Sequence, residues 1–253
     1  KIKWGTWVKG EYQFAGLLPD FYQRAIKNDG GGVNASFLEG EAHFVYELHS
    51  HSLKVSAKIK KWFFKDADKT SAIFILPDDF LSFEPRLIYT FWKLKNDASF
   101  FDAHRLFFRI RGFYFQAGTG LSLRNKTKSW GFLSQNNIRN NNPLKTAFDI
   151  KQSAGFGLDL KPFRIQLKQS IFLSQGFDDI NRERIGGLNP YVTQLAGAPW
   201  ASFLSERHFS VHPSIHVLIF GESEIGVGLD YVVFDDLERK GESKLDSLAG
   251  LWI

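Results

Sequence analysis

The stretch LEGEAHFVYELHSHSLKVSAKIK, residues 38–60, decides the fold, because its apolar side chains recur at every second position. Leu, Ala, Phe and Tyr alternate with Glu and His in its first half, and Leu, Val, Ala and Ile alternate with Lys and Ser in its second half. A period of two is typical of β-strands that have one apolar and one polar face. We therefore expect two long antiparallel strands joined by a tight turn at Ser50 and His51.

A turn at these two residues fixes which side chains face each other across the hairpin. On the polar face it predicts polar pairs, two of them of opposite charge, and on the other face pairs of apolar residues. The polar pairs are Glu47 with Lys54, His43 with Lys58, and Glu41 with Lys60. The apolar pairs are Leu48 with Leu53, Tyr46 with Val55, and Phe44 with Ala57.

The same alternation runs through most of the chain and predicts an all-β protein, a single domain over residues 1–253. We expect about ten strands in up-and-down antiparallel order, at residues 2–14, 38–49, 53–60, 83–95, 105–123, 148–159, 163–171, 200–220, 224–233 and 244–253. Pro85 and Pro213 fall within two of them, and each should mark a bulge or a strand end, because proline lacks a ladder donor. A break at Pro213 would allow twelve strands.

The connections between these strands alternate between tight and long. Tight ones fall near Ser50, Asn96, Pro162 and Glu222, and long polar ones span residues 16–34, 65–82, 124–144, 175–199 and 235–243. In an up-and-down sheet every second connection lies at the same end. Short turns should therefore lie at one end, together with both chain termini, and long loops at the other.

Strand length and composition favour a transmembrane β-barrel. Most of the strands, of about 11 to 20 residues, exceed the usual 5 or 6 of soluble sheets and suit tilted bilayer crossings of about 9 to 11 residues. Aromatic side chains on the apolar faces could form interfacial girdles; they are Trp4, Tyr12, Phe14, Tyr46, Tyr89, Phe91, Tyr114 and Tyr231. Arg207 would then face lipid, which is tolerable only near the membrane surface. A soluble ligand-binding β-barrel, with its apolar face inside, explains any single strand equally well and remains the alternative.

The composition of the chain excludes several further classes of protein. The chain has 253 residues, a net charge of +5 and no Cys, which excludes disulfide scaffolds and thiol nucleophiles. No apolar run approaches the roughly 18 residues of a membrane-spanning helix. Because the chain opens with Lys1 and lacks Met, we expect an exported chain whose signal peptide has been removed. The positive charge is spread out, so we expect no nucleic-acid partner.

In these features the chain resembles the Gram-negative outer-membrane β-barrel class, down to an apolar last strand at residues 245–253. The resemblance implies a bacterial outer-membrane location, contact with membrane lipid and lipopolysaccharide, and contact with other envelope proteins. The stretch RIGGLNPY, residues 184–191, also looks like the C-terminal region of the Omp85 assembly family. The chain lacks the lumenal Arg-Gly dipeptide of that family and is too short for its larger barrel.

The polar faces of the strands should line the enclosed space, or lumen. The predicted lining residues are Glu39, Glu41, His43, Glu47, Lys54, Lys58, Lys60, Arg86, Arg105, Arg109, Arg111, Arg164, Lys168, Glu206, His208, His212, His216 and Asp230. They could line a permeation path or form a salt-bridged plug. A barrel only slightly larger than eight strands is nearly filled by its own side chains. We therefore expect a mostly occluded lumen.

Two side-chain groups suggest chemistry. His208, His212 and His216 share a strand face, but along a strand the Cα atoms of each His and the next lie about 13 Å apart, too far to ligate one metal. We therefore expect no metal site and no cofactor. Ser214, His212 and Asp230 have the residue types of a hydrolase triad. Outer-membrane phospholipases and lipid A deacylases present such residues to lipid, whereas these three should point inward, where hydrogen bonding alone explains them.

The sequence therefore favours a non-enzymatic outer-membrane β-barrel that acts as a pore or as a structural subunit of an envelope complex. The alternatives are an outer-membrane lipid hydrolase using Ser214, His212 and Asp230, and a soluble ligand-binding β-barrel.

Overall fold

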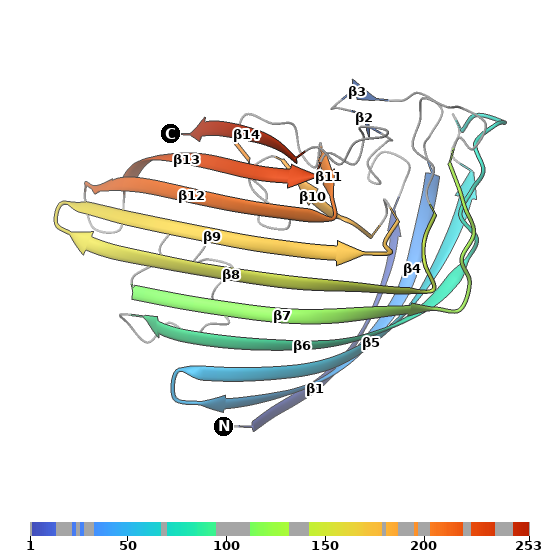
Figure 1. Ribbon diagram of the computed structural model, residues 1–253. Coiled ribbons are helices and arrows are strands. Elements are labelled where there is room, and N and C mark those ends of the chain that lie inside the picture. The colour runs from blue at the N-terminus through green and yellow to red at the C-terminus, as the bar shows by residue number, and fades with distance from the viewer. Residues whose placement is uncertain are drawn as a thin grey trace.

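A computed structural model describes residues 2–13, 22–23, 26–27, 33–66, 70–94, 112–131, 142–178, 181–186, 195–196, 203–219, 224–235 and 245–252. Within these ranges the protein forms one ten-stranded antiparallel sheet in the order β1-β4-β5-β6-β7-β8-β9-β12-β13-β14 (Figure 1). Each strand pairs with the preceding and following sheet strands of the chain. The predicted all-β, up-and-down antiparallel arrangement is therefore confirmed.

The sheet strands are mostly long. They are β1 (Ile2–Gln13), β4 (Val33–Leu48), β5 (His51–Asp66), β6 (Phe80–Leu94), β7 (Gly112–Arg124), β8 (Thr146–Leu160), β9 (Phe163–Gln175), β12 (Arg207–Leu218), β13 (Glu224–Asp235) and β14 (Leu245–Trp252). Two short pairs lie outside the sheet, β2 (Tyr22–Gln23) with β3 (Ile26–Lys27) and β10 (Glu183–Ile185) with β11 (Phe203–Ser205). The described residues contain no helix long and apolar enough to cross a membrane.

The sheet curves strongly but does not close within the described residues. β1 pairs with β4 and β14 pairs with β13, and no pairing joins β1 to β14 there. Ile2 of β1 lies opposite Tyr46, and Trp252 of β14 lies opposite Gly228. The start of β1 and the end of β14 therefore lie at the end of the sheet that carries the two-residue turns, as Figure 1 also shows.

The curved sheet has an outer, convex face and an inner, concave face, and the two differ sharply. The apolar and polar side chains lie on opposite faces, as the alternation in the sequence predicts. The outer face exposes large apolar side chains from β4 through β14, including Leu38, Leu53, Leu87, Phe156, Ile165, Ile215 and Leu229. The inner face carries buried polar and charged side chains, including Glu39, Asp149, Arg164, Gln166, His216 and Asp230. This distribution is the reverse of a soluble barrel, in which the apolar face is enclosed.

The register of the first hairpin differs from the predicted one by two residues. The turn lies at His49 and Ser50, where His49 has a positive φ of 51°, and Leu48 pairs with His51. The predicted pairs are therefore wrong; the structure aligns Glu41 with Lys58, Glu39 with Lys60, and Phe44 with Val55. Because the shift is an even number of residues, every side chain keeps its predicted face.

Two further strand predictions are corrected. Residues 105–111 of the predicted fifth strand lie outside the described residues, and in its described part, β7, the alternation places Tyr114 on the inner face, not on the apolar face. The predicted strand at 200–220 is divided into β11, which pairs with β10, and β12, which belongs to the main sheet. Arg207, at the start of β12, has an exposed side chain paired with Asp235, at the loop end where we expected it to be tolerated.

The two prolines interrupt pairing on one side only. Pro85 keeps its place opposite Ala57 of β5, while the pairing of β6 with β7 skips residues 84–85 and resumes in the same register. Pro213 pairs with Leu167 of β9, while the pairing of β12 with β13 skips residues 212–213. Neither proline marks a bulge or a strand end, so the predicted breaks are wrong and the main sheet has ten strands.

Candidate functional site

The inner face of the sheet brings together most of the predicted lining residues. Those found there are Glu39, Glu41, His43, Glu47, Lys54, Lys58, Lys60, Arg86, Arg164, Lys168, His208, His212, His216 and Asp230. Glu206 lies just before β12 and pairs with Arg182. Arg105, Arg109 and Arg111 lie outside the described residues.

Ion pairs cover the inner face of β4 and β5. Lys54 Nζ donates to Glu41 Oε1 at 2.8 Å, and Glu41 also lies 3.6 Å from His43 Nδ1. Glu39 lies between two lysines, 3.7 Å from Lys58 Nζ and 3.5 Å from Lys60 Nζ. The predicted ladder of opposite charges is therefore present, although with partners displaced along the strands.

A second set of ion pairs continues across β6, β7 and β8. Arg86 donates to Asp149 Oδ2 at 2.9 Å, reaching over Gly120 of the strand between them. Lys151, on the same face of β8, donates to Glu183 Oε1 at 2.9 Å. Charged groups thus extend along the inner face from β4 to β8, and the buried carboxylates among them, Glu39 and Asp149, are paired with cations, as buried charges require.

The connecting segment between β9 and β12 spans residues 176–206, and its described parts, residues 176–178, 181–186, 195–196 and 203–206, contact this inner face. Residues 175–199 are predicted as a long polar loop, but most of the described apolar residues of the segment are buried. Ile185 and Leu195 pack with Val232 and Phe234 of β13, and Phe203 and Leu248 border the cluster. Isolated apolar residues such as Ile185 and Leu195 within a polar stretch are the signal that indicates this packing.

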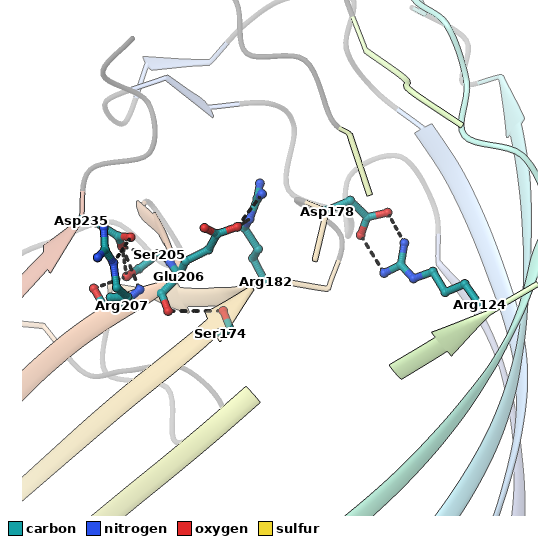
Figure 2. A network of polar contacts seen from close by, with 8 residues as sticks. All are labelled: Arg124, Ser174, Asp178, Arg182, Ser205, Glu206, Arg207 and Asp235. Atoms are coloured by element: carbon teal, nitrogen blue, oxygen red, sulfur yellow. Dashed lines mark hydrogen bonds and ion pairs between the residues drawn. The ribbon is translucent and has the colours of Figure 1, made fainter. Parts of the chain in front are cut away.

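One end of the connecting segment is held by a buried ion pair with β7. Arg124 donates through Nη1 to Asp178 Oδ2 at 2.8 Å and through Nη2 to Oδ1 at 3.3 Å (Figure 2). Both side chains are almost fully buried. Burial alone would raise the pKa of the Asp178 carboxyl, but Arg124, together with Asn181 and Arg182, lowers that pKa below its ordinary value of 3.8. Asp178 is therefore ionised at neutral pH.

The other end of the segment is held at Asp235, the last residue of β13. Its Oδ1 accepts hydrogen bonds from Ser205 Oγ and from the backbone N–H groups of Glu206 and Arg207 at 2.8–3.0 Å (Figure 2). Arg182 in turn donates twice to Glu206 Oε1, at 2.9 and 3.2 Å. The segment is thus tied to the sheet at both of its ends.

Between these ends, Ala196 lies directly on β13 and β14. Its N–H donates to Asp230 Oδ2 at 2.8 Å. Gly250 lies opposite Asp230 on β14, and a Cβ atom at Gly250 would overlap the carbonyl of Ala196. Gly250 therefore provides the space in which the segment contacts the sheet.

The hydrolase candidate is rearranged by the structure. Asp230 Oδ1 lies 2.9 Å from His212 Nδ1, as predicted, but His212 Nε2 lies 3.0 Å from Ser210 Oγ. Ser214 instead contacts His216 Nε2, so the predicted grouping of Ser214 with His212 is wrong. Ser210 is completely buried and also bonds to Ser170. The Asp–His–Ser order is that of a triad, but this serine has no exposed surface for a substrate.

The three histidines of β12 make separate contacts. The His208 ring stacks on Phe172 at 5.3 Å, His212 bonds to Asp230, and His216 bonds to Ser214. Within the described ranges no three His, Cys, Asp or Glu side chains are placed to hold a metal ion.

No protein-family model and no curated protein sequence matches this chain. Its function is therefore inferred from the geometry of the two sheet faces.

Proposed function

We propose that this protein is a transmembrane β-barrel of the bacterial outer membrane that acts as a narrow pore for small polar solutes. The observation that carries the proposal is the distribution of side chains between the two faces. Leu, Ile, Phe and Val side chains are exposed along the outer face, while carboxylates, lysines and arginines occupy the inner face.

Hydrocarbon is the environment that suits the outer face. Exposed apolar surface is unfavourable in water by roughly 25 cal/mol per Å², and the outer face presents such surface on every sheet strand from β4 to β14. Monomeric soluble proteins rarely expose apolar patches larger than a few hundred Å². A soluble ligand-binding barrel would have the opposite distribution, so we favour the membrane.

Strand length and an aromatic band support the same proposal. β4 to β9 have 13 to 16 residues, enough for a tilted crossing of the bilayer. On the outer face near the turn end, His51 packs against Phe91 at 5.0 Å, Phe91 against Phe113 at 6.0 Å, and Tyr89 against Phe115 at 6.5 Å. Aromatic side chains gather in this way at membrane–water interfaces.

The proposal requires the two edge strands to meet. An open sheet edge in hydrocarbon leaves backbone N–H and C=O groups unsatisfied, at several kcal/mol each. We therefore propose that β1 and β14 pair in the membrane and close the sheet into a barrel. Single cysteines placed along both strands in an otherwise Cys-free chain should form disulfides in one register; no cross-link in any register would contradict closure.

Conductance tests the pore directly. Purified protein in a planar bilayer should give small, stepwise currents, because the described part of the connecting segment lies on the inner face of β13 and β14 and should narrow the passage. A flat trace at every voltage would count against a pore. It would favour the second candidate function, a structural subunit of an envelope complex. The packed inner face of β13 and β14 is also compatible with that function. Co-purification of a partner in mild detergent would support it.

The lipid-hydrolase candidate depends on Ser210, not on Ser214. Hydrolysis of phospholipid vesicles by the native chain, lost in Ser210→Ala and kept in Ser214→Ala, would establish it. We expect no hydrolysis, because Ser210 is completely buried on the inner face and lipid lies against the outer face.

A further inference from the structure

We infer that the passage along the inner face of β4 to β8 carries anions. This inference rests on the proposed pore function and adds the class of solute to it. It is carried by the unequal exposure of the partners in the ion pairs of this part of the wall.

In each of these ion pairs the cation is more exposed than the anion. The Arg86 side chain is 51% exposed and that of Asp149 only 10%; the values are 50% for Lys151 and 18% for Glu183, and 33% for Lys54 and 11% for Glu41. Lys58 and Lys60 are likewise more exposed than Glu39, which both contact. The carboxylates lie close to the wall, and the ammonium and guanidinium groups lie towards the enclosed space.

The pairs with the opposite order lie elsewhere. Arg164 is buried and Asp159 more exposed, beside the β8–β9 turn. Arg182 and Glu206 belong to the connecting segment itself. The anion is therefore the less exposed partner in the ion pairs described for the inner wall from β4 to Lys151 of β8. In this part of the wall the connecting segment bonds through Asp178 and Glu183.

This arrangement suits anions for two physical reasons. A guanidinium has five N–H donors and an ammonium has three, so one carboxylate does not use up the hydrogen-bonding capacity of Arg86 or Lys54. The more exposed partners of these ion pairs are all positive, and exposed charge of one sign beside low-dielectric walls raises the local concentration of counter-ions. Passages lined by exposed Arg and Lys accordingly favour anions and phosphate groups.

Ion selectivity tests the inference while conductance itself tests the pore. In an uncharged phosphatidylcholine bilayer with a KCl gradient, the reversal potential of the native chain should show chloride favoured over potassium by roughly threefold or more. Arg86→Gln combined with Lys151→Gln should bring this ratio close to one. Lys128→Gln, in an exposed loop ion pair with Asp78, is the matched control and should leave it unchanged. If the native chain conducts but is cation-selective or unselective, the proposed anion path is wrong and the proposed pore is not affected. The same holds if the chloride-to-potassium ratio is unchanged in the double variant.

A chemical readout tests the same charge without current. Ser153 lies on the inner face of β8, two residues from Lys151, and the chain has no native Cys. In Ser153→Cys, an anionic methanethiosulfonate should react several-fold faster than a cationic one, relative to Ala72→Cys in an exposed loop. A faster cationic reagent, equal rates, or no reaction with either reagent would overturn the inference. A flat bilayer trace together with preferential anionic labelling would reject the pore and still support a basic interior that binds anions.

Discussion

Arg86 of β6 and Asp149 of β8 form an ion pair across the intervening strand, directly above Gly120 of β7. The three residues lie in register, and the Arg86 Nη2 to Asp149 Oδ2 distance is 2.9 Å. A Cβ atom at Gly120 would lie 2.7 Å from Asp149 Oδ2 and 3.0 Å from Arg86 Nε. Glycine is therefore the residue that allows the charges of two non-adjacent strands to meet on the inner face.

Gly120→Val should lower the free energy of unfolding by about 1 to 3 kcal/mol, because the added side chain overlaps the ion pair. Urea unfolding in detergent micelles, followed by tryptophan fluorescence, measures the loss. In a chain that already carries Arg86→Gln and Asp149→Asn the same substitution should be less costly. An equal loss in both backgrounds would show that the ion pair does not determine the need for glycine.

Asp178→Asn should destabilise the protein by about 3 to 5 kcal/mol, because it leaves the buried Arg124 guanidinium without its counter-charge. Asp78→Asn is the matched control, since Asp78 pairs with Lys128 on an exposed surface, and it should change stability by less than about 1 kcal/mol. Equal effects of the two substitutions would contradict the anchoring role of Asp178.

The effect of Asp178→Asn should also depend on pH. The folded-state pKa of Asp178 lies below its ordinary value of 3.8, so the ion pair contributes fully above pH 3.8 and is lost as the pH falls through the folded-state pKa. The stability difference between the native chain and Asp178→Asn should therefore be constant near neutral pH and shrink only in strong acid. A difference that already shrinks well above pH 3.8 would contradict the lowered pKa.

Gly250→Val should displace the connecting segment from β13 and β14, because its side chain would occupy the position of the Ala196 carbonyl. In planar bilayers we expect a larger single-channel conductance than that of the native chain. Ala249→Val, at the neighbouring residue whose side chain lies on the outer face, should leave the conductance unchanged. The occluding role of the segment would be wrong if both variants conducted like the native chain.

The sequence predicted the two faces of the sheet because alternation along a strand depends only on local order. β8, β9 and β13 have the predicted apolar and polar sides. Tyr114 was misplaced because its face was extrapolated from the apolar residues at 106–110, which lie before β7 and outside the described residues. The hairpin register depended on whether His49 adopts a positive φ, which the sequence HSHS does not decide.

The candidate site was less predictable, because its contacts join residues far apart in the chain. Ser210 and Ser214 are each two residues from His212 on the same face, so spacing alone cannot tell which serine contacts the imidazole. The anchors at Arg124 and Gly250 are invisible to local patterns, because each pairs with a residue of the connecting segment 54 positions away along the chain. Composition marks that segment as a polar loop. Its isolated apolar residues Ile185 and Leu195 indicate that it packs against the protein, but the sequence does not show that they contact Val232 and Phe234 of β13.

Spin labels along β9 can show whether lipid contacts the outer face of the sheet. Single cysteines at positions 163–173 of the protein reconstituted in bilayers would carry nitroxide labels, whose accessibility to oxygen and to a polar nickel complex is measured by power saturation. Labels replacing Phe163, Ile165, Leu167, Ile171 and Leu173 should favour oxygen, and those replacing Arg164, Gln166, Lys168 and Ser170 should not. Absence of this alternation, or preferential access of the nickel complex to the labels at positions 165 and 167, would contradict the account.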